Sequence, residues 1–444
     1  MLIPSNRLLL WSASALVPAA LLASFAPQLA SWGVLLTALL LAAACFDAWR
    51  AAARLDGLSV SVPSVTRLSL GREGEFDVTV AFADALRGQR LRVAIDSDAA
   101  SGIADTARDY TLPAEFDRAR FAWPCRPAKR GLYGIRLAAC ETDAPWGLWH
   151  VVHRLPLAGE LRVYPDLRRE RRKVPAVFLR RGTAGAHVHR TAGKGREFEK
   201  LREYVPGDDL GDIHWKATAR RRFPVTKVYQ VERTQEVYVV LDVSRLSGRR
   251  IESDEPQSVL DQYIRSALTL VLAAEQLGDR CGLLVFHRRV VAFLPADSGK
   301  RHFDACRNAL YTAATEPVSP DFRELFAFIR GRIPKRALLL FLTHLDSPAL
   351  AEPFLESARL VTRQHLLAVP LLTPRAAQPV FSGEPPANED DVWRELAGHL
   401  QWRQLKELER QLRACGVRTA LAPAGDATVA LVSHYLAVKE RQLL

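Results

Sequence analysis

The stretch EVYVVLDVSRLS, residues 236–247, decides the fold of the larger part of this chain. Its apolar run from Val237 to Leu241 predicts a buried strand, and an acid and two hydroxyls follow at Asp242, Ser244 and Ser247. Ligands of doubly wound sheets bind at the carboxyl ends of the strands. We therefore expect any functional site of this part of the chain directly after this strand.

Downstream of residue 236, strand-like apolar runs alternate with longer amphipathic ones, which is typical of a parallel sheet covered by helices. The predicted strands are RCGLLVFH (280–287), RALLLFLTHL (336–345), HLLAVPLL (365–372) and 417–422, with VVAFLPA (290–296) as a hairpin partner. The predicted helices span about 257–277, 300–312, 322–333, 348–363, 392–415 and 428–441. The pattern predicts a doubly wound, Rossmann-like α/β domain.

The spacing D-x-S of Asp242 and Ser244 resembles the start of the metal-ion-dependent adhesion site of von Willebrand factor A domains. There, an aspartate and two hydroxyls offer hard oxygen ligands to a divalent ion. Leu246 occupies the position of the second serine, and Ser247 lies next to it.

The remaining ligands of such a site are incomplete. His344 stands where an acid is expected after the later strand, and the nearest further candidates are Ser319 and Asp346. Imidazole suits Mg²⁺ poorly. We therefore expect a degenerate site that binds Mg²⁺ weakly or not at all, and we expect no other cofactor.

Immediately upstream lies GREFEKLREYVPGDDLGDIHWKATARRRFPVTKVYQVE, residues 195–232, which we call the signature segment. The spacing of Phe198, Leu201 and Tyr204 predicts a short helix that ends at Pro206-Gly207. Nearby acidic and basic residues could form salt bridges that hold the segment on the α/β domain, with Trp215 as an apolar anchor. Two interpretations stay open, an ordered connector packed on that domain and a partner-binding surface.

The signature segment resembles that of the bacterial family called domain of unknown function fifty-eight. The matching positions are Gly195, Glu197, Phe198, Leu201, Arg202, Tyr204, Gly207, Asp208, Ile213, Trp215, Ala219 and Arg220. The wider order also resembles the family, with a membrane hairpin, a β domain ending in RGLYGIRLAACETDAPWGLWH, the signature segment and a von Willebrand A-like domain.

Members of that family are commonly associated with AAA+ ATPases of the MoxR type. The resemblance therefore implies such an ATPase as a partner, with the von Willebrand A-like domain as the expected contact. The candidate partner surface in the signature segment comprises Glu197, Phe198, Arg202, Tyr204, Gly207, Asp208, Trp215 and Arg220.

Much of the chain's net charge of +12 lies between residues 168 and 222, where 16 Lys or Arg face 7 Asp or Glu. Residues 166–195 lack apolar periodicity and predict a basic linker. Contact of the 168–222 segment with anionic lipid or with nucleic acid is an alternative function. No helix-turn-helix or RNA-binding signature accompanies the charge, so a nucleic-acid partner is not expected.

Between residues 57 and 165, short alternating runs are separated by Gly, Pro and Asp clusters. The runs are LSVSV, EFDVTVAF, QRLRVAI, YGIRLAA and LRVYP. Strands of this length with frequent turn signals predict a small antiparallel β-sandwich.

The N-terminal residues 1–56 predict a transmembrane helical hairpin. No charged side chain occurs from Leu8 to Phe46, and these 39 residues are about twice what one crossing needs. A break at Pro27-Gln28 leaves two spans, Leu8–Ala26 and Leu29–Phe46. Arg7, Arg50 and Arg54 flank the spans, so the positive-inside rule predicts a two-pass protein of the bacterial inner membrane with both termini and all soluble domains in the cytoplasm.

Composition and motifs limit the function classes. Six dispersed cysteines without a C-x-x-C pair indicate reduced structural thiols. Neither G-x-x-x-x-G-K-[ST] nor a G-x-G-x-x-G after a strand occurs, so any ATP would be hydrolysed by a partner. We predict a non-catalytic membrane-anchored interaction protein without a small-molecule substrate. The alternative enzyme is a metal-dependent hydrolase in which Asp242, Ser244 and Asp346 hold Mg²⁺ and His287 or His344 acts as the base.

Overall fold

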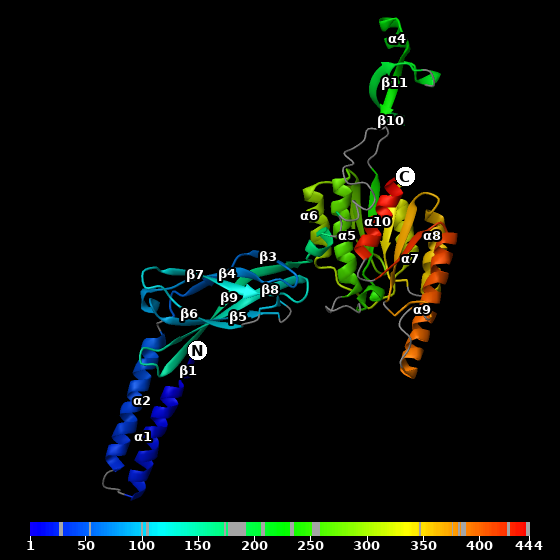
Figure 1. Cartoon of the computed structure of the whole chain (residues 1–444). Helices are drawn as coiled ribbons and strands as arrows, with labels where there is room; N and C mark the ends of the chain where they lie inside the picture. The colour runs from blue at the N-terminus through cyan, green and yellow to red at the C-terminus, as the bar shows by residue number, and fades with distance from the viewer. Residues whose placement is uncertain are drawn as a thin grey trace. The chain divides into compact units, whose positions relative to one another are not determined.

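The structure is a computed structural model in which the chain forms two compact units, Met1–Asp166 and Leu167–Leu444 (Figure 1). It describes all residues except 26–29, 53–54, 99–100, 104–105, 173–174, 176–191, 206–208, 231–234, 251–257, 346–347, 375, 381, 383–387, 424–426 and 441–444.

The first unit begins with two apolar helices that follow a short strand, β1 (Leu2–Pro4). Helix α1 spans Asn6–Phe25 and helix α2 spans Ala30–Ala52, close to the two predicted spans. The predicted break at Pro27-Gln28 lies outside the described residues. We call α1 and α2 the helix pair.

The helix pair is closely packed, with α1 and α2 side by side (Figure 1). A Cβ added to Gly33 of α2 would lie 3.0 Å from the Cβ of Ala19 in α1, so only glycine allows this approach without a shift. Among the described residues, one helix, Ser31–Ala51, is long and apolar enough to cross a membrane.

The rest of the first unit consists of two packed sheets. One sheet has the order β1-β9-β8-β5-β6, with β3 added in parallel to β9, and the other has the order β2-β4-β7. Apart from the β3–β9 pair, all these neighbours are antiparallel. The strands are β2 (Ser59–Ser61), β3 (Val65–Ser69), β4 (Gly74–Ala81), β5 (Arg90–Ser97), β6 (Ala107–Thr111), β7 (Arg118–Cys125), β8 (Gly131–Asp143) and β9 (Trp149–Tyr164).

The core of this β-sandwich comes from alternate strand positions. In β4, for example, Phe76, Val78 and Val80 are buried while the residues between them are partly exposed. Trp123 of β7 is fully buried among them. This period of two places one face of each strand in the core, as the alternating sequence pattern predicted.

The second unit contains a six-stranded sheet with the order β14-β13-β12-β15-β16-β17. Five strands are parallel, and the edge strand β14 is antiparallel to β13, as expected for a hairpin partner. The strands are β12 (Glu236–Asp242), β13 (Arg280–Phe286), β14 (Val290–Asp297), β15 (Leu338–Leu342), β16 (Leu366–Thr373) and β17 (Arg418–Pro423).

Helices cover both faces of this sheet, which makes it doubly wound (Figure 1). The buried side chains of α5 (Val259–Gln276), α6 (Lys300–Leu310) and α10 (Ala427–Glu440) share one core. Those of α7 (Phe322–Arg332), α8 (Pro348–Val361) and α9 (Glu389–Ala414) share the other. These elements lie within a few residues of the predicted ones and form the α/β domain.

The signature segment differs from its prediction. Strand β10 (Ala192–Glu203) replaces the expected short helix and pairs antiparallel with β11 (Val225–Gln230). The β-branched residues of β11 favour strand pairing, and hydrogen bonds between the two strands override a helical pattern supported by only three apolar residues. A short η4 (Leu210–Asp212) and helix α4 (Trp215–Arg221) connect the two strands.

Candidate functional site

The candidate metal site lies at the carboxyl end of the sheet, where Asp242 ends β12 and Thr343 follows the neighbouring parallel strand β15. Both side chains are buried. The hydroxyl of Thr343 donates to Oδ2 of Asp242 at 2.7 Å, and the backbone N–H of Ser244 donates to Oδ1 at 2.8 Å. Both carboxyl oxygens of Asp242 are therefore engaged by groups of the domain itself.

The two predicted serines lie just after Asp242, Ser247 inside a short helix, η5 (Arg245–Gly248), and Ser244 directly before it. Ser244 caps this helix, because its Oγ accepts a hydrogen bond from the N–H of Leu246 at 3.3 Å. Ser247 is buried, and its Oγ has no hydrogen-bond partner in the described part of the chain. Leu246, at the position of the second serine, is also buried and contributes to packing.

The electrostatics of the site follow from its burial. Removal from water raises the pKa of Asp242, and the hydrogen bonds from Thr343 and Ser244 oppose this shift without cancelling it. Below this pair, the Tyr263 hydroxyl donates to the carbonyl oxygen of Thr343 at 3.1 Å, and burial raises the pKa of Tyr263 as well. Asp242, Ser244, Thr343 and Tyr263 are thus joined by a network of hydrogen bonds.

The other candidate residues are distributed around this network. His287 is buried. Its Nε2 lies 3.4 Å from a carboxylate oxygen of Glu316, and its Nδ1 accepts a hydrogen bond from the N–H of Arg288 at 2.5 Å. Ser319 is exposed, although its loop lies against η5 through a backbone hydrogen bond from Arg245 to Val318 at 3.0 Å. His344 is half-buried. Asp346 lies outside the described residues.

The described donor set differs from that of a magnesium site of the adhesion type in its acidic ligands. Such a site needs a carboxylate and hydroxyls free to offer lone pairs to the ion. Here the carboxylate of Asp242 accepts two hydrogen bonds and keeps further lone pairs, whereas imidazole stands at His344 in place of the second acid. Among the described residues, no group of three or more His, Cys, Asp or Glu side chains is arranged to hold a metal.

The signature segment presents a different kind of surface. Trp215 is 70% exposed, so its predicted role as an apolar anchor on the α/β domain is wrong. Ile213 and Val225 are the buried apolar residues here, because η4 and α4 fold back against β11. The backbone N–H of His214 donates to the carbonyl of Val225 at 2.8 Å and fixes this arrangement.

The remaining predicted surface residues are divided among the elements of this segment. Arg202 in β10 and Arg220 in α4 are exposed, and Tyr204, which follows β10, is half-buried. Glu197 and Phe198 lie in β10, and Phe198 pairs with Tyr229 of β11 in the backbone register. Gly207 and Asp208 lie outside the described residues.

Two residues of the site were not singled out from the sequence, Thr343 and Tyr263. The sequence did contain a signal for Thr343, because this residue directly follows a predicted strand. That strand was expected in the same parallel sheet as the strand that ends at Asp242. Tyr263 had none, because a tyrosine inside an amphipathic helix is usually a core residue.

Residues 200–383 match the family described as "Protein of unknown function DUF58". The uncharacterized protein Rv1480 of Mycobacterium tuberculosis is 24% identical over 254 residues, which cover 52% of this chain and 76% of that protein. Among solved structures, the conserved hypothetical protein BatB from Bacteroides thetaiotaomicron covers 47% of this chain and 99% of its own at 14% identity, with a TM-score of 0.30. The VWA domain of SpRpn10 covers 46% of this chain and 94% of its own at 8% identity, with a TM-score of 0.27.

The family match begins inside the signature segment and continues through β16 of the α/β domain. The matched region therefore contains the signature positions from Leu201 to Arg220, which carry the family resemblance of the sequence. It also contains Asp242 and its surroundings. Residues 200–383 of this chain are thus similar to the DUF58 family of proteins of unknown function.

Proposed function

We propose that this chain is a membrane-anchored protein that acts by binding a protein partner through its signature segment and α/β domain, without catalysis of its own. The observation that carries this proposal is the exposure of large apolar side chains on the signature segment. Trp215 is 70% exposed, Leu210 68% and Val205 51%. Exposed apolar side chains grouped in one segment are typical of an interaction site.

The charges around these side chains favour a partner with an acidic surface. Lys216, Arg220, Arg221 and Arg222 are all exposed on or directly after α4. Tryptophan and arginine are the residues most enriched among the energetically dominant positions of protein interfaces. An exposed tryptophan next to arginines is thus suited to anchor a protein complex.

The proposed partner is a MoxR-type AAA+ ATPase, as the family resemblance implies. The chain has no nucleotide-binding motif that would let it hydrolyse ATP. The hydrogen bonds to Asp242 from Ser244 and Thr343 are compatible with a binding role, because they give that carboxyl group a structural function within the domain. The ATPase would then supply the energy, and this chain would supply the membrane attachment.

Co-purification tests this proposal with the full chain in its native membranes. A tagged chain should retain the MoxR-type ATPase of the same organism after detergent extraction. Trp215→Ala should lower the retained amount by about tenfold or more, as expected for loss of a dominant interface side chain.

The matched control is Trp393→Ala, because Trp393 of α9 is also exposed, at 67%, but lies outside the signature segment whose exposed side chains carry the proposal. This variant should retain the ATPase at the wild-type level. Absence of the ATPase from the wild-type preparation, or equal losses in the two variants, would contradict the proposed interface.

We also propose that the helix pair crosses the membrane twice and that all soluble parts are cytoplasmic. Strand β1, before α1, pairs with β9 of the β-sandwich, which lies after α2, in the register Leu2↔Val151 to Pro4↔Trp149. The chain therefore starts and continues on the same side of any bilayer that the helix pair enters, which requires an even number of crossings.

The polar groups of α1 are compatible with a bilayer. The hydroxyls of Ser12, Ser14 and Ser24 each donate to a carbonyl oxygen three or four residues earlier, so they are satisfied without water. Arg7 and Arg50 lie at the ends of the helices that adjoin the β-sandwich. The positive-inside rule places that end in the cytoplasm.

A reporter fused after Leu444 checks this topology. Alkaline phosphatase should be inactive there and green fluorescent protein should be fluorescent, because both report the cytoplasmic side. Active phosphatase at this position would exclude the two-pass arrangement.

A further inference from the structure

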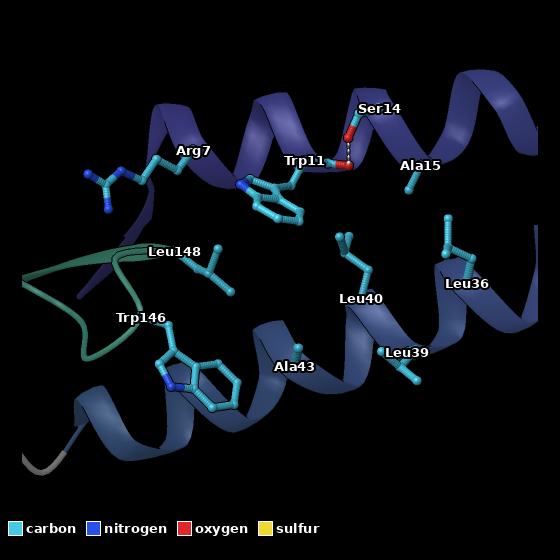
Figure 2. A pocket seen from close by; sticks show the side chains of 10 residues that line it. All are labelled: Arg7, Trp11, Ser14, Ala15, Leu36, Leu39, Leu40, Ala43, Trp146 and Leu148. Atoms are coloured by element: carbon cyan, nitrogen blue, oxygen red, sulfur yellow. Dashed lines mark hydrogen bonds between the residues drawn. The ribbon is translucent and has the colours of Figure 1, made fainter.

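A pocket of about 710 Å³ lies in the first unit between α1, α2 and the turn that joins β8 to β9 (Figure 2). Its wall on α2 is formed by apolar residues that include Leu36, Leu40 and Ala43. These positions extend over about 10 Å of helix at 1.5 Å per residue. The pocket therefore offers a continuous apolar surface along the helix pair.

The end of the pocket next to the β-sandwich has a different character. Figure 2 shows the rings of Trp11 and Trp146 and the side chain of Arg7 at this end. Trp11 is 57% exposed and Trp146 50%. Tryptophan side chains of membrane proteins concentrate at the level of the lipid headgroups, because the ring is apolar and its N–H is polar.

Arg7 is the cationic residue among those that line the pocket. Its guanidinium lies against Gly147, where a Cβ would stand 3.2 Å from Nη1, and the φ of +70° at Gly147 also favours glycine. Within the described part of the chain, no carboxylate forms an ion pair with Arg7. The charge thus faces the pocket without an internal counter-ion.

The turn that closes the pocket is fixed to both helices. The carboxylate of Asp47 in α2 accepts hydrogen bonds from the N–H groups of Trp146 at 2.9 Å and Leu148 at 3.1 Å. On the other side, the hydroxyl of Ser5, just before α1, donates to the carbonyl of Gly147 at 2.7 Å. A preformed pocket loses little entropy when a ligand binds.

We propose that this pocket binds an anionic phospholipid from the cytoplasmic leaflet. One acyl chain would lie along the apolar wall of α2, and the phosphate would pair with the guanidinium of Arg7 beside Trp11 and Trp146. Arginine matches the geometry of phosphate through paired N–H donors. The inference rests on the proposed membrane anchor, and it adds a specific lipid class that the anchor alone does not require.

Native mass spectrometry of the full chain in detergent tests this inference with dioleoyl phosphatidylglycerol and dioleoyl phosphatidylcholine, which share their acyl chains. Wild type should retain the anionic lipid about fivefold better, the ratio expected from about 1 kcal/mol for one basic residue at the headgroup level. Arg7→Gln should abolish this preference. Ala43→Phe should lower retention of both lipids, because the added ring occupies the acyl-chain wall without changing the charge.

Arg50→Gln is the matched control, since it removes one positive charge at the same end of the helix pair from a residue that does not line the pocket. It should keep the wild-type preference. Equal retention of the two lipids by wild type would overturn the inference. Equal losses in Arg7→Gln and Arg50→Gln would also overturn it, because they would show general electrostatic attraction instead of a site.

Extraction of native membranes with alkaline carbonate separates this inference from the proposed anchor. If wild type stays in the membrane pellet but shows no lipid preference, the lipid site is wrong and the anchor stands. If wild type is extracted as a soluble protein, both are wrong. Arg7→Gln and Ala43→Phe should remain in the pellet.

Discussion

Two aspartates are buried at opposite ends of the same parallel sheet, and their surroundings differ. Asp279, just before β13, accepts hydrogen bonds from the ammonium group of Lys439 at 2.7 Å and the hydroxyl of Tyr435 at 2.5 Å. Asp242, at the end of β12, accepts hydrogen bonds from a hydroxyl and a backbone N–H, both neutral donors. One buried acid has a cation in direct contact, and the other is held by dipoles.

The difference in hydrogen-bond donors separates Asp279, which has a structural role, from Asp242, which lies where the sheet resembles a ligand site. A buried carboxylate is stable when a cation and further hydrogen bonds replace the water it loses. Asp279 meets this condition and connects α10 to the start of β13. Asp242 lacks the cation, so burial raises its pKa and its environment favours the protonated form. The buried acid at the amino end of the sheet is stabilised by a cation, and the one at the carboxyl end is held by neutral donors.

The largest expected effect is therefore at Asp279. Asp279→Ala should lower the free energy of unfolding of the α/β domain by about 3–5 kcal/mol, because it leaves the Lys439 ammonium and the Tyr435 hydroxyl without their buried partner. The measurement is the denaturant dependence of thiol labelling at Cys281 and Cys306 in the full chain, located by mass spectrometry. Both thiols are buried, and burial raises the pKa of Cys306 to about 12, so they react only when the domain opens.

Two controls accompany this variant. Glu407→Ala removes an ion pair of the same length, 2.7 Å to Arg410, but on the exposed surface of α9, and it should cost less than about 1 kcal/mol. Cys125 and Cys140 report the β-sandwich in the same experiment and should not change. Equal losses in Asp279→Ala and Glu407→Ala would show that burial of the ion pair does not matter here.

The same comparison shows how far sequence reasoning extends. Local patterns of apolar residues encode the strand that ends at Asp242 and the elements after it. The periodicity of those apolar residues therefore predicts these elements closely. The contacts of Asp279 with Tyr435 and Lys439 join residues more than 150 positions apart. No local pattern encodes such a contact, and it becomes visible only in the folded chain.

The candidate site shows the same limit. Asp242, Ser244 and Ser247 could be found because they follow one strand, whereas Tyr263 required the packing of α5 on the sheet. In the signature segment, the pairing of β10 with β11 spans the intervening η4 and α4. A helical spacing of three apolar residues could not reveal that pairing, and the exposure of Trp215 follows from the fold of the segment.

A smaller effect is expected at Asp242. Asp242→Ala should lower the free energy of unfolding by about 2 kcal/mol, because the Ser244 N–H and the Thr343 hydroxyl lose their acceptor in a buried place. Asp242→Asn should cost less than this, since its amide oxygen can still accept from Ser244 and its amide N–H can donate to the Thr343 oxygen. The thiol-labelling measurement on the full chain compares the two variants. A larger loss in Asp242→Asn than in Asp242→Ala would contradict this account of the network.

The pH dependence of the Asp242→Asn variant then decides whether the site is a remnant or a working metal site. A raised pKa in the folded state means that Asp242 contributes stability below its unfolded pKa of about 3.9 and loses it as the pH rises through the folded pKa. Asp242→Asn does not titrate, so its free energy of unfolding relative to wild type should improve as the pH rises from about 4 to 8. His287 contributes an attractive charge when protonated and only moderates this trend.

Mg²⁺ at millimolar concentration should leave the stability difference between wild type and Asp242→Asn unchanged, because we expect no ion to bind. A bound ion would instead favour the carboxylate and stabilise wild type at neutral pH. Stabilisation of wild type by Mg²⁺ that is absent from Asp242→Asn would mean that the hydrogen bonds of Asp242 open to complete a metal site.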